Sequence, residues 1–115
     1  MSKSHLDLLH HISDELDFLL SDSATTNLKN FLNDEKTKRA YARSFEIIGE
    51  ASKNIPDNIK DQYSEIEWKS MARMRDRLIH HYFGVDYELV WSIVNENIPI
   101  FKEQLQKILQ NHKQD

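Results

Sequence analysis

Apolar residues recur at intervals of three and four along most of the chain, the spacing that places side chains on one face of an α-helix. In the N-terminal half, this pattern predicts a helix over about 5–21 and a second one that ends near 55. Between them, 23–32 looks like a loop with a short helical turn. We expect Asn33 to cap the second helix, because Asp34 and the next residue, a glutamate, are then in its favourable first turn.

The C-terminal half shows the same helical spacing. A linking turn is expected at 57–65, a third helix from about 67 to 82, and a fourth from about 87 to 111. Pro99 falls inside the fourth segment and should kink that helix near Ile98. With strand signals nearly absent, the sequence predicts an all-α, antiparallel four-helix bundle with a kinked C-terminal helix.

Composition supports one helical domain. The chain has 115 residues, 39% of them hydrophobic, with two glycines, two prolines and no cysteine. This length suits a single domain over 1–115 with its core over about 5–110. The sequence has no signal-peptide pattern and no apolar run of about 18 residues, so we expect a cytoplasmic protein that does not cross a membrane. Gly49 lies inside the second helix, where a glycine costs about 1 kcal/mol relative to alanine, and this predicts close helix packing there.

The charge pattern restricts any contact with nucleic acid to a local patch. A net charge of −4 argues against a general nucleic-acid coating protein. Four cations nevertheless surround one acid, Asp76, between residues 69 and 81, and those at possible RNA-contact positions are Lys69, Arg73 and Arg77. A second basic series, over 36–43, is either a solvated helix face or an extension of an RNA groove that includes Arg43.

Arg75, the remaining cation of that patch, falls on the apolar arc of the third helix. On a continuous helix it projects near the middle of an arc made by Trp68, Met71, Ala72, Leu78, Ile79 and Tyr82. A guanidinium keeps its proton, so this position requires an anion or a route to water. The anion is either a carboxylate, with Glu46 or Glu50 in the second helix as the possible partners, or a phosphate that binds from outside.

Five residues after Arg75 comes His80, whose side chain can transfer protons near neutral pH, followed by His81 and Tyr82. RNA cleavage at a 2′-OH needs a base, an acid and positive charge at the phosphate, which these residue types can supply. A regular helix would separate Arg75 and His80 by about 140°. Either the helix loosens before His80, or two copies meet so that one arginine faces the other copy's histidine; we favour the dimer.

The spacing R-x4-H-x-Y, together with four ordered blocks of which the last contains it, resembles the HepT-like ribonuclease toxins of the HEPN superfamily. The matching blocks are FLNDEKT (31–37), EIIGEA (46–51), IEW (66–68) and MRDRLIH (74–80) followed by YFGVD (82–86). The resemblance covers about residues 5–110. It implies a dimeric HEPN bundle whose cleft cuts RNA without a metal ion or other cofactor.

The resemblance also implies roles for single residues. Arg75 and His80 take the active-site positions, Asp76 takes the polar position after the arginine, and Tyr82 takes the position that the partner antitoxin modifies with AMP. That antitoxin is an MntA-like minimal nucleotidyltransferase. We interpret His81, Glu46 and Glu50 as supporting residues.

Together these features predict the toxin of a toxin–antitoxin pair, an endoribonuclease acting on tRNA or mRNA. The alternative is a non-catalytic HEPN module that binds a nucleotidyltransferase partner or a nucleotide. Tyr82 could also be an ordinary core or cap residue, and His80 an ordinary helix-end histidine. We expect no metal site at His10 and His11, because adjacent helical residues point about 100° apart.

Overall fold

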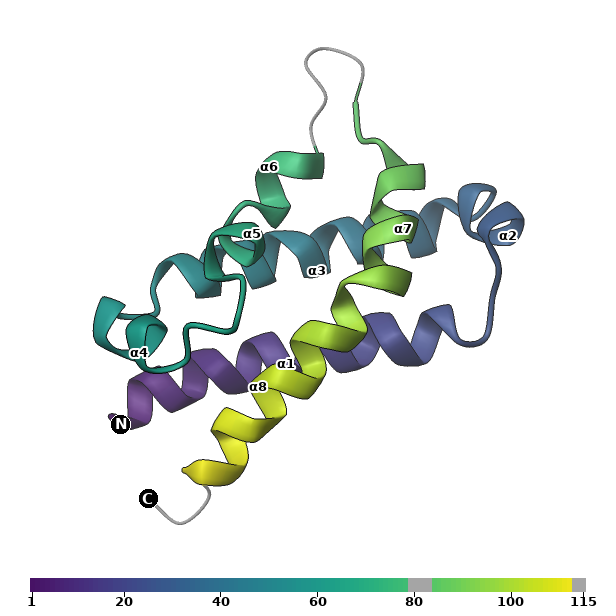
Figure 1. Cartoon of the computed structure of the whole chain (residues 1–115). Helices are drawn as coiled ribbons and strands as arrows, with labels where there is room; N and C mark the ends of the chain where they lie inside the picture. The colour runs from purple at the N-terminus through teal and green to yellow at the C-terminus, as the bar shows by residue number, and fades with distance from the viewer. Residues whose placement is uncertain (79–83, 113–115) are drawn as a thin grey trace.

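The computed structural model describes residues 1–78 and 84–112, and every regular element in these residues is a helix (Figure 1). The all-α prediction is therefore confirmed for the described chain. The four expected helices are divided further in the structure. The elements are α1 (Lys3–Ser23), α2 (Leu28–Leu32), α3 (Glu35–Lys53), α4 (Asp57–Gln62), α5 (Trp68–Ala72), α6 (Met74–Leu78), α7 (Tyr87–Glu96) and α8 (Ile98–Asn111).

The two longest helices, α1 and α3, pack against each other and carry the smaller elements (Figure 1). The Asp34 side chain caps α3 by accepting a hydrogen bond from the Thr37 backbone amide at 3.2 Å. The prediction of Asn33 as this cap was wrong, because Asn33 ends α2. A hydrogen bond from the Thr37 hydroxyl at 2.7 Å, followed by the one from its amide, lowers the pKa of the Asp34 carboxyl.

The short helices α2 and α4 occupy segments with weaker sequence signals. The helical turn expected within 23–32 is present as α2, whose buried Phe31 stacks against Tyr41 of α3 with ring centroids 4.7 Å apart. The linking turn expected over 57–65 was wrong, since most of that segment forms α4. This helix buries Ile59 in the core, which explains why it is ordered.

The third predicted helix is interrupted at Arg73, which separates α5 from α6. Arg73 has φ −88° and ψ 1°, outside the helical region, and the helical phase changes there. Met71, Met74 and Leu78 have the spacing of one helical face and are buried in the core on both sides of this interruption. The expected continuation through His80 to Tyr82 lies outside the described residues.

The fourth predicted helix is also two helices, α7 and α8, which meet at Asn97. Pro99 lies in the first turn of α8, where its missing N–H breaks no helical hydrogen bond. The interruption falls one residue before Ile98, the position predicted from the proline.

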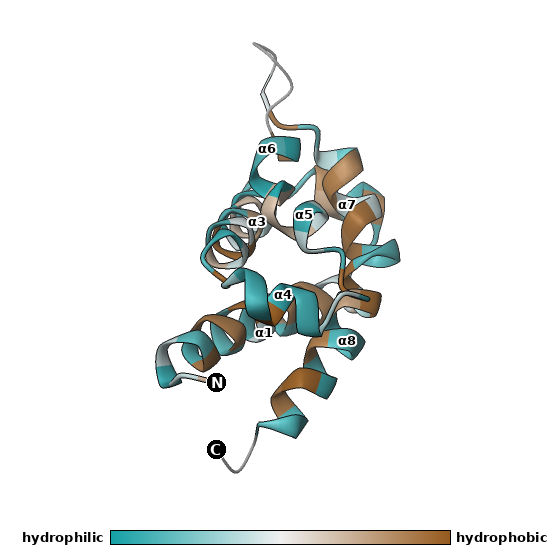
Figure 2. Ribbon diagram, turned by 60° about the vertical axis from the view of Figure 1, so that its left-hand side comes forward, coloured by the Kyte–Doolittle hydropathy of each residue, from teal (hydrophilic) through white to brown (hydrophobic). Residues whose placement is uncertain are grey.

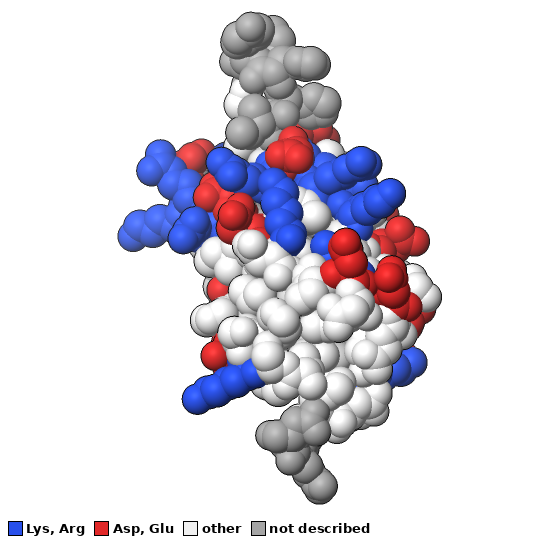
Figure 3. All heavy atoms as spheres, turned by 90° about the vertical axis from the view of Figure 1, so that its left-hand side faces the viewer, with Lys and Arg blue, Asp and Glu red and all other residues white. Residues whose placement is uncertain are grey.

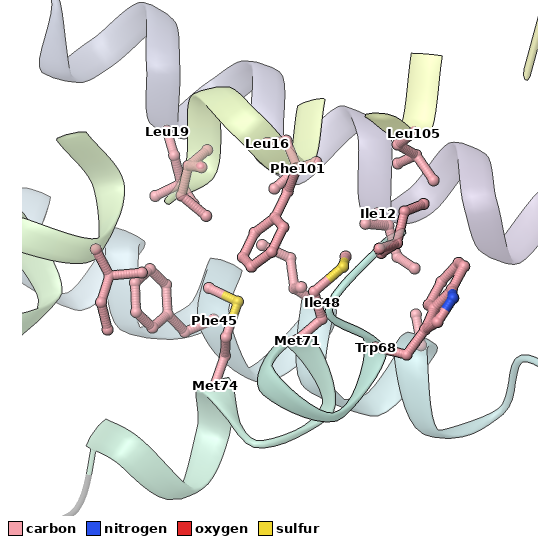
Figure 4. Packing of buried hydrophobic residues seen from close by; sticks show 14 of the residues in the cluster. Ile12, Leu16, Leu19, Phe45, Ile48, Trp68, Met71, Met74, Phe101 and Leu105 are labelled. Carbon is pink, nitrogen blue, oxygen red and sulfur yellow. The ribbon is translucent and has the colours of Figure 1, made fainter. Parts of the chain in front are cut away.

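The core lies where α1, α3 and α8 meet the α5–α6 pair (Figure 4). Hydrophobic and hydrophilic residues alternate along the long helices (Figure 2), and the buried side chains are almost all hydrophobic. Polar contacts fasten α1 to its neighbours: Lys102 of α8 donates to Ser13 at 2.7 Å and forms an ion pair with Asp17 at 2.9 Å. Among the described residues, no helix has the length and apolar content needed to cross a membrane.

Candidate functional site: a charged hollow between α3 and α6

The closest contact between α3 and the α5–α6 pair is at Gly49. A Cβ atom on Gly49 would lie 3.2 Å from the carbonyl oxygen of Ala72 and 3.3 Å from both the backbone nitrogen and Cβ of Arg75. These distances leave no comfortable space for a methyl group. The close packing predicted for Gly49 is therefore present, and it sets the start of α6 directly against α3.

The Arg75 side chain extends from this contact toward solvent and is 55% exposed. Its Nη1 atom lies 4.0 Å from Oε2 of Glu50, whose side chain is 63% exposed. Arg75 and Glu50 line an open hollow of about 310 Å³ together with Arg43 and Glu46, which form an ion pair of 3.3 Å with each other. The hollow thus has two guanidinium groups and two carboxylates, and it opens to water.

The prediction that Arg75 sits within a buried apolar face was wrong. Met74, only 1% exposed, occupies the core position of α6, and its neighbour Arg75 faces outward. The alternative, a buried ion pair between Arg75 and Glu46 or Glu50, was also wrong, because all three side chains are exposed to solvent. Glu50 is indeed the carboxylate nearest Arg75, but the pair is long and exposed, so it contributes only about 0–1 kcal/mol to stability.

The other predicted site residues do not converge on this hollow. Arg77 lines a different cavity, of about 270 Å³, with residues of α7 and α8, and Lys69 lines a third beside α4. Arg73 and Asp76 are exposed. Within the second basic series, Lys38 is only 14% exposed, because it pairs with Glu35 at 2.8 Å and lies 5.0 Å from the centre of the Tyr87 ring.

Three further predictions, for His80, His81 and Tyr82, fall outside the described residues. In the sequence, His80 comes two residues after Leu78, the last described residue of α6.

Charged side chains gather in a band across one face of the molecule, above a broad region with few charges (Figure 3). Both signs occur in the band, consistent with a chain whose net charge is −4. The positive charge available to an RNA phosphate is therefore local and depends on individual arginines.

A groove between α1 and α3 adjoins the hollow and was not predicted. It shares Arg43, Glu46 and Glu50 with the hollow and continues over the partly buried apolar side chains of Leu8 and Ile47. Its signal in the sequence was weak: Leu8 only broadens the apolar stripe of α1. An apolar strip beside a charged hollow is suited to contact with another macromolecule.

The hollow can bind an anion through Arg75 and Arg43. A guanidinium presents a planar array of N–H donors that matches two phosphate oxygens, and neither arginine is fully engaged by its carboxylate partner. Among the described residues, no three His, Cys, Asp or Glu side chains are grouped as metal ligands would be.

The described residues thus define an all-α protein with a solvent-facing guanidinium set against a glycine in a charged hollow. Residues 8–108 match the model of one family, described as "Ribonuclease HepT-like". The chain belongs to the HepT-like ribonuclease family, and membership makes it a ribonuclease.

Individual relatives agree with this assignment. "Probable ribonuclease HepT" of Thermococcus cleftensis is 45% identical over 108 residues, which cover 94% of this chain and 98% of the relative. "Putative RNase MJ0127" of Methanocaldococcus jannaschii is 41% identical over 105 residues, which cover 91% and 84% of the two chains. No solved structure matches the chain significantly.

Proposed function

We propose that the protein is a metal-independent endoribonuclease that cleaves RNA at a 2′-OH, with Arg75 and His80 as its catalytic residues. Arg75 binds the phosphate and stabilises the charge that develops on its oxygens. His80 transfers a proton. The single observation that carries this assignment is the Arg75 side chain, which is anchored at its backbone by Gly49 yet exposed at its guanidinium.

We further propose that the active form is a homodimer of four-helix HEPN bundles. Arg75 and His80 are five residues apart, and a second copy can supply the histidine that faces a given arginine. The groove over Leu8 and Ile47 adjoins the hollow and offers apolar area for such a contact. Sedimentation at micromolar concentration should detect the dimer, whereas a fully active monomer would contradict it.

The biological role proposed here is that of a cytoplasmic toxin acting on tRNA or mRNA. Its antitoxin is an MntA-like nucleotidyltransferase that attaches AMP to Tyr82. The added phosphate brings negative charge near Arg75 and thereby opposes RNA binding. Family membership and the R-x4-H-x-Y spacing support this role.

A second candidate is a non-catalytic HEPN module that binds the nucleotidyltransferase or a nucleotide. The net charge of −4 favours this alternative, because a chain with more acidic than basic residues is not suited to bind RNA along an extended basic groove. Both candidates predict a complex with the nucleotidyltransferase, so complex formation does not discriminate between them.

Expression of the chain alone in a bacterial host tests the two candidates. The ribonuclease should arrest growth and Arg75→Ala should relieve the arrest. Arg77→Ala is the matched control, because it removes the same charge from α6 but from a different cavity. If the wild-type chain leaves growth unaffected although it accumulates as folded, unmodified protein, the binding module becomes the better account.

A further inference from the structure

We infer that Glu50 is the general base of the reaction, the group that removes the proton from the attacking 2′-OH. This inference rests on the proposed ribonuclease function, which needs both a base and an acid. Glu50 lies next to Gly49 in α3, and its Oε2 atom is 4.0 Å from Nη1 of Arg75. A phosphate bound to Arg75 would bring the neighbouring 2′-OH close to this carboxylate.

Stability does not explain the Arg75–Glu50 pair. Both side chains are more than half exposed and 4.0 Å apart, a geometry that contributes little to folding. The backbones beneath them are nonetheless packed as closely as a glycine allows. The structure thus brings a carboxylate beside the guanidinium of Arg75 while both side chains remain open to a substrate.

Glu46 provides the comparison that makes Glu50 the better base. It lines the same hollow, one turn earlier in α3, but its Oε2 atom is 3.3 Å from Arg43 of its own helix. Glu46 is therefore tied to a neighbour in sequence, whereas Glu50 faces the arginine of another element. The two residues have the same chemistry and differ in their partner.

The proton balance of the step is complete with these groups. Glu50 takes the proton of the 2′-OH as the 2′-oxygen forms a bond to phosphorus. The bond between phosphorus and the 5′-oxygen breaks, and protonated His80 donates its proton to that oxygen. The products are a 2′,3′-cyclic phosphate and a 5′-hydroxyl, and water returns both residues to their starting protonation states.

The test compares two RNA substrates that differ in the leaving atom. One has the natural 5′-oxygen; the other has sulfur at that bridging position, which leaves as a thiolate and needs no acid. Glu50→Gln should lower kcat by about 100-fold or more on both substrates, since loss of a base affects both. His80→Ala should lose activity on the RNA with the natural 5′-oxygen and regain it on the RNA with the bridging sulfur. Glu103→Gln, which removes an exposed carboxylate of α8 that does not line the hollow, should stay within a few-fold of wild type.

Binding of uncleavable 2′-O-methyl RNA separates a base from a residue that only orients Arg75. Glu50→Gln should bind this RNA as tightly as wild type or more tightly, because a negative charge beside the phosphate is removed. Weaker binding would make Glu50 a positioning residue, and recovery of Glu50→Gln on the sulfur substrate would make it the acid. Either result overturns the inference, as does wild-type activity in Glu50→Gln. A wild-type chain that cuts neither substrate overturns the ribonuclease proposal as well.

Discussion

The backbone of Arg75 crosses Gly49 so closely that a methyl group on Gly49 would lie 3.3 Å from the Arg75 nitrogen. This contact joins the α3 helix, which carries both carboxylates of the hollow, to the short α6 helix, which carries Arg75, the residue proposed to bind phosphate. This packing sets α6 against α3, so that the exposed side chains of Arg75 and Glu50 come within 4.0 Å of each other.

Gly49→Ala should reduce cleavage more than it reduces stability. The added Cβ pushes against backbone atoms of Ala72 and Arg75, so α6 must shift by a few tenths of an ångström. The gain in helix propensity, about 1 kcal/mol, offsets part of the strain. We expect kcat/KM to fall about tenfold or more while the free energy of unfolding changes by less than about 2 kcal/mol, on the scale of a small packing change. Unchanged cleavage would show that the spacing has no role in activity.

Arg75→Lys should lose about 100-fold or more in kcat/KM, because a lysine cannot bind two phosphate oxygens through a planar fork. Arg77→Lys is the control on the same helix, and its cavity is separate from the hollow. We expect the control to keep cleavage within a few-fold of wild type. Cleavage assays at several salt concentrations would check both variants, and equal losses would contradict a specific role for Arg75.

Tyr82→Phe should keep ribonuclease activity and escape silencing, because it removes the hydroxyl that receives AMP. Mass spectrometry after incubation with the nucleotidyltransferase and ATP would detect the adduct on wild type and none on the variant. Tyr87→Phe is a suitable control and should be modified and silenced as wild type is. Continued silencing of Tyr82→Phe would refute the assigned modification site.

Tyr41→Phe should lower stability and weaken its dependence on alkaline pH. The buried Tyr41 hydroxyl donates a hydrogen bond to Oδ2 of Asp22 at 2.7 Å, and its loss should cost about 1–2 kcal/mol. Burial, followed by this hydrogen bond to a carboxylate, raises the pKa of Tyr41 above its usual range. The contribution is thus fully present below about pH 10 and is lost as pH rises, because the unfolded tyrosine ionises first.

Denaturant unfolding at pH 8 and pH 10.5 would check this dependence. The wild-type chain should lose more stability between the two pH values than Tyr41→Phe does. Tyr87→Phe retains the Tyr41–Asp22 hydrogen bond and should behave as wild type. An equal pH dependence in Tyr41→Phe and wild type would contradict the assignment.

The sequence predicted the helical class and the close contact at Gly49 because both depend on local signals: apolar periodicity, and a glycine where helix propensity disfavours it. It did not predict the exposure of Arg75. That error arose because Met74 and Arg75 are adjacent in the sequence, and tertiary packing of Met74 and Leu78 decides which side of α6 is buried.

The site was predictable only in part for the same reason. The spacing from Arg75 to His80 and the carboxylates of the second helix were visible in the sequence. Arg75 pairs with Glu50 and not with Glu46 because of where α6 crosses α3. This crossing point cannot be predicted from the local sequence pattern. The groove over Leu8 likewise arises only when α1 packs against α3.

RNA cleavage by the purified, unmodified chain in EDTA tests the central claim most directly, with His80→Ala prepared identically. Mass spectrometry should first establish that Tyr82 carries no adduct. We expect the wild-type chain to cut RNA and His80→Ala to lose that activity by about 100-fold or more, the scale of a lost acid–base group. Equal cleavage by both proteins, or none by either, would contradict a metal-independent ribonuclease that uses His80.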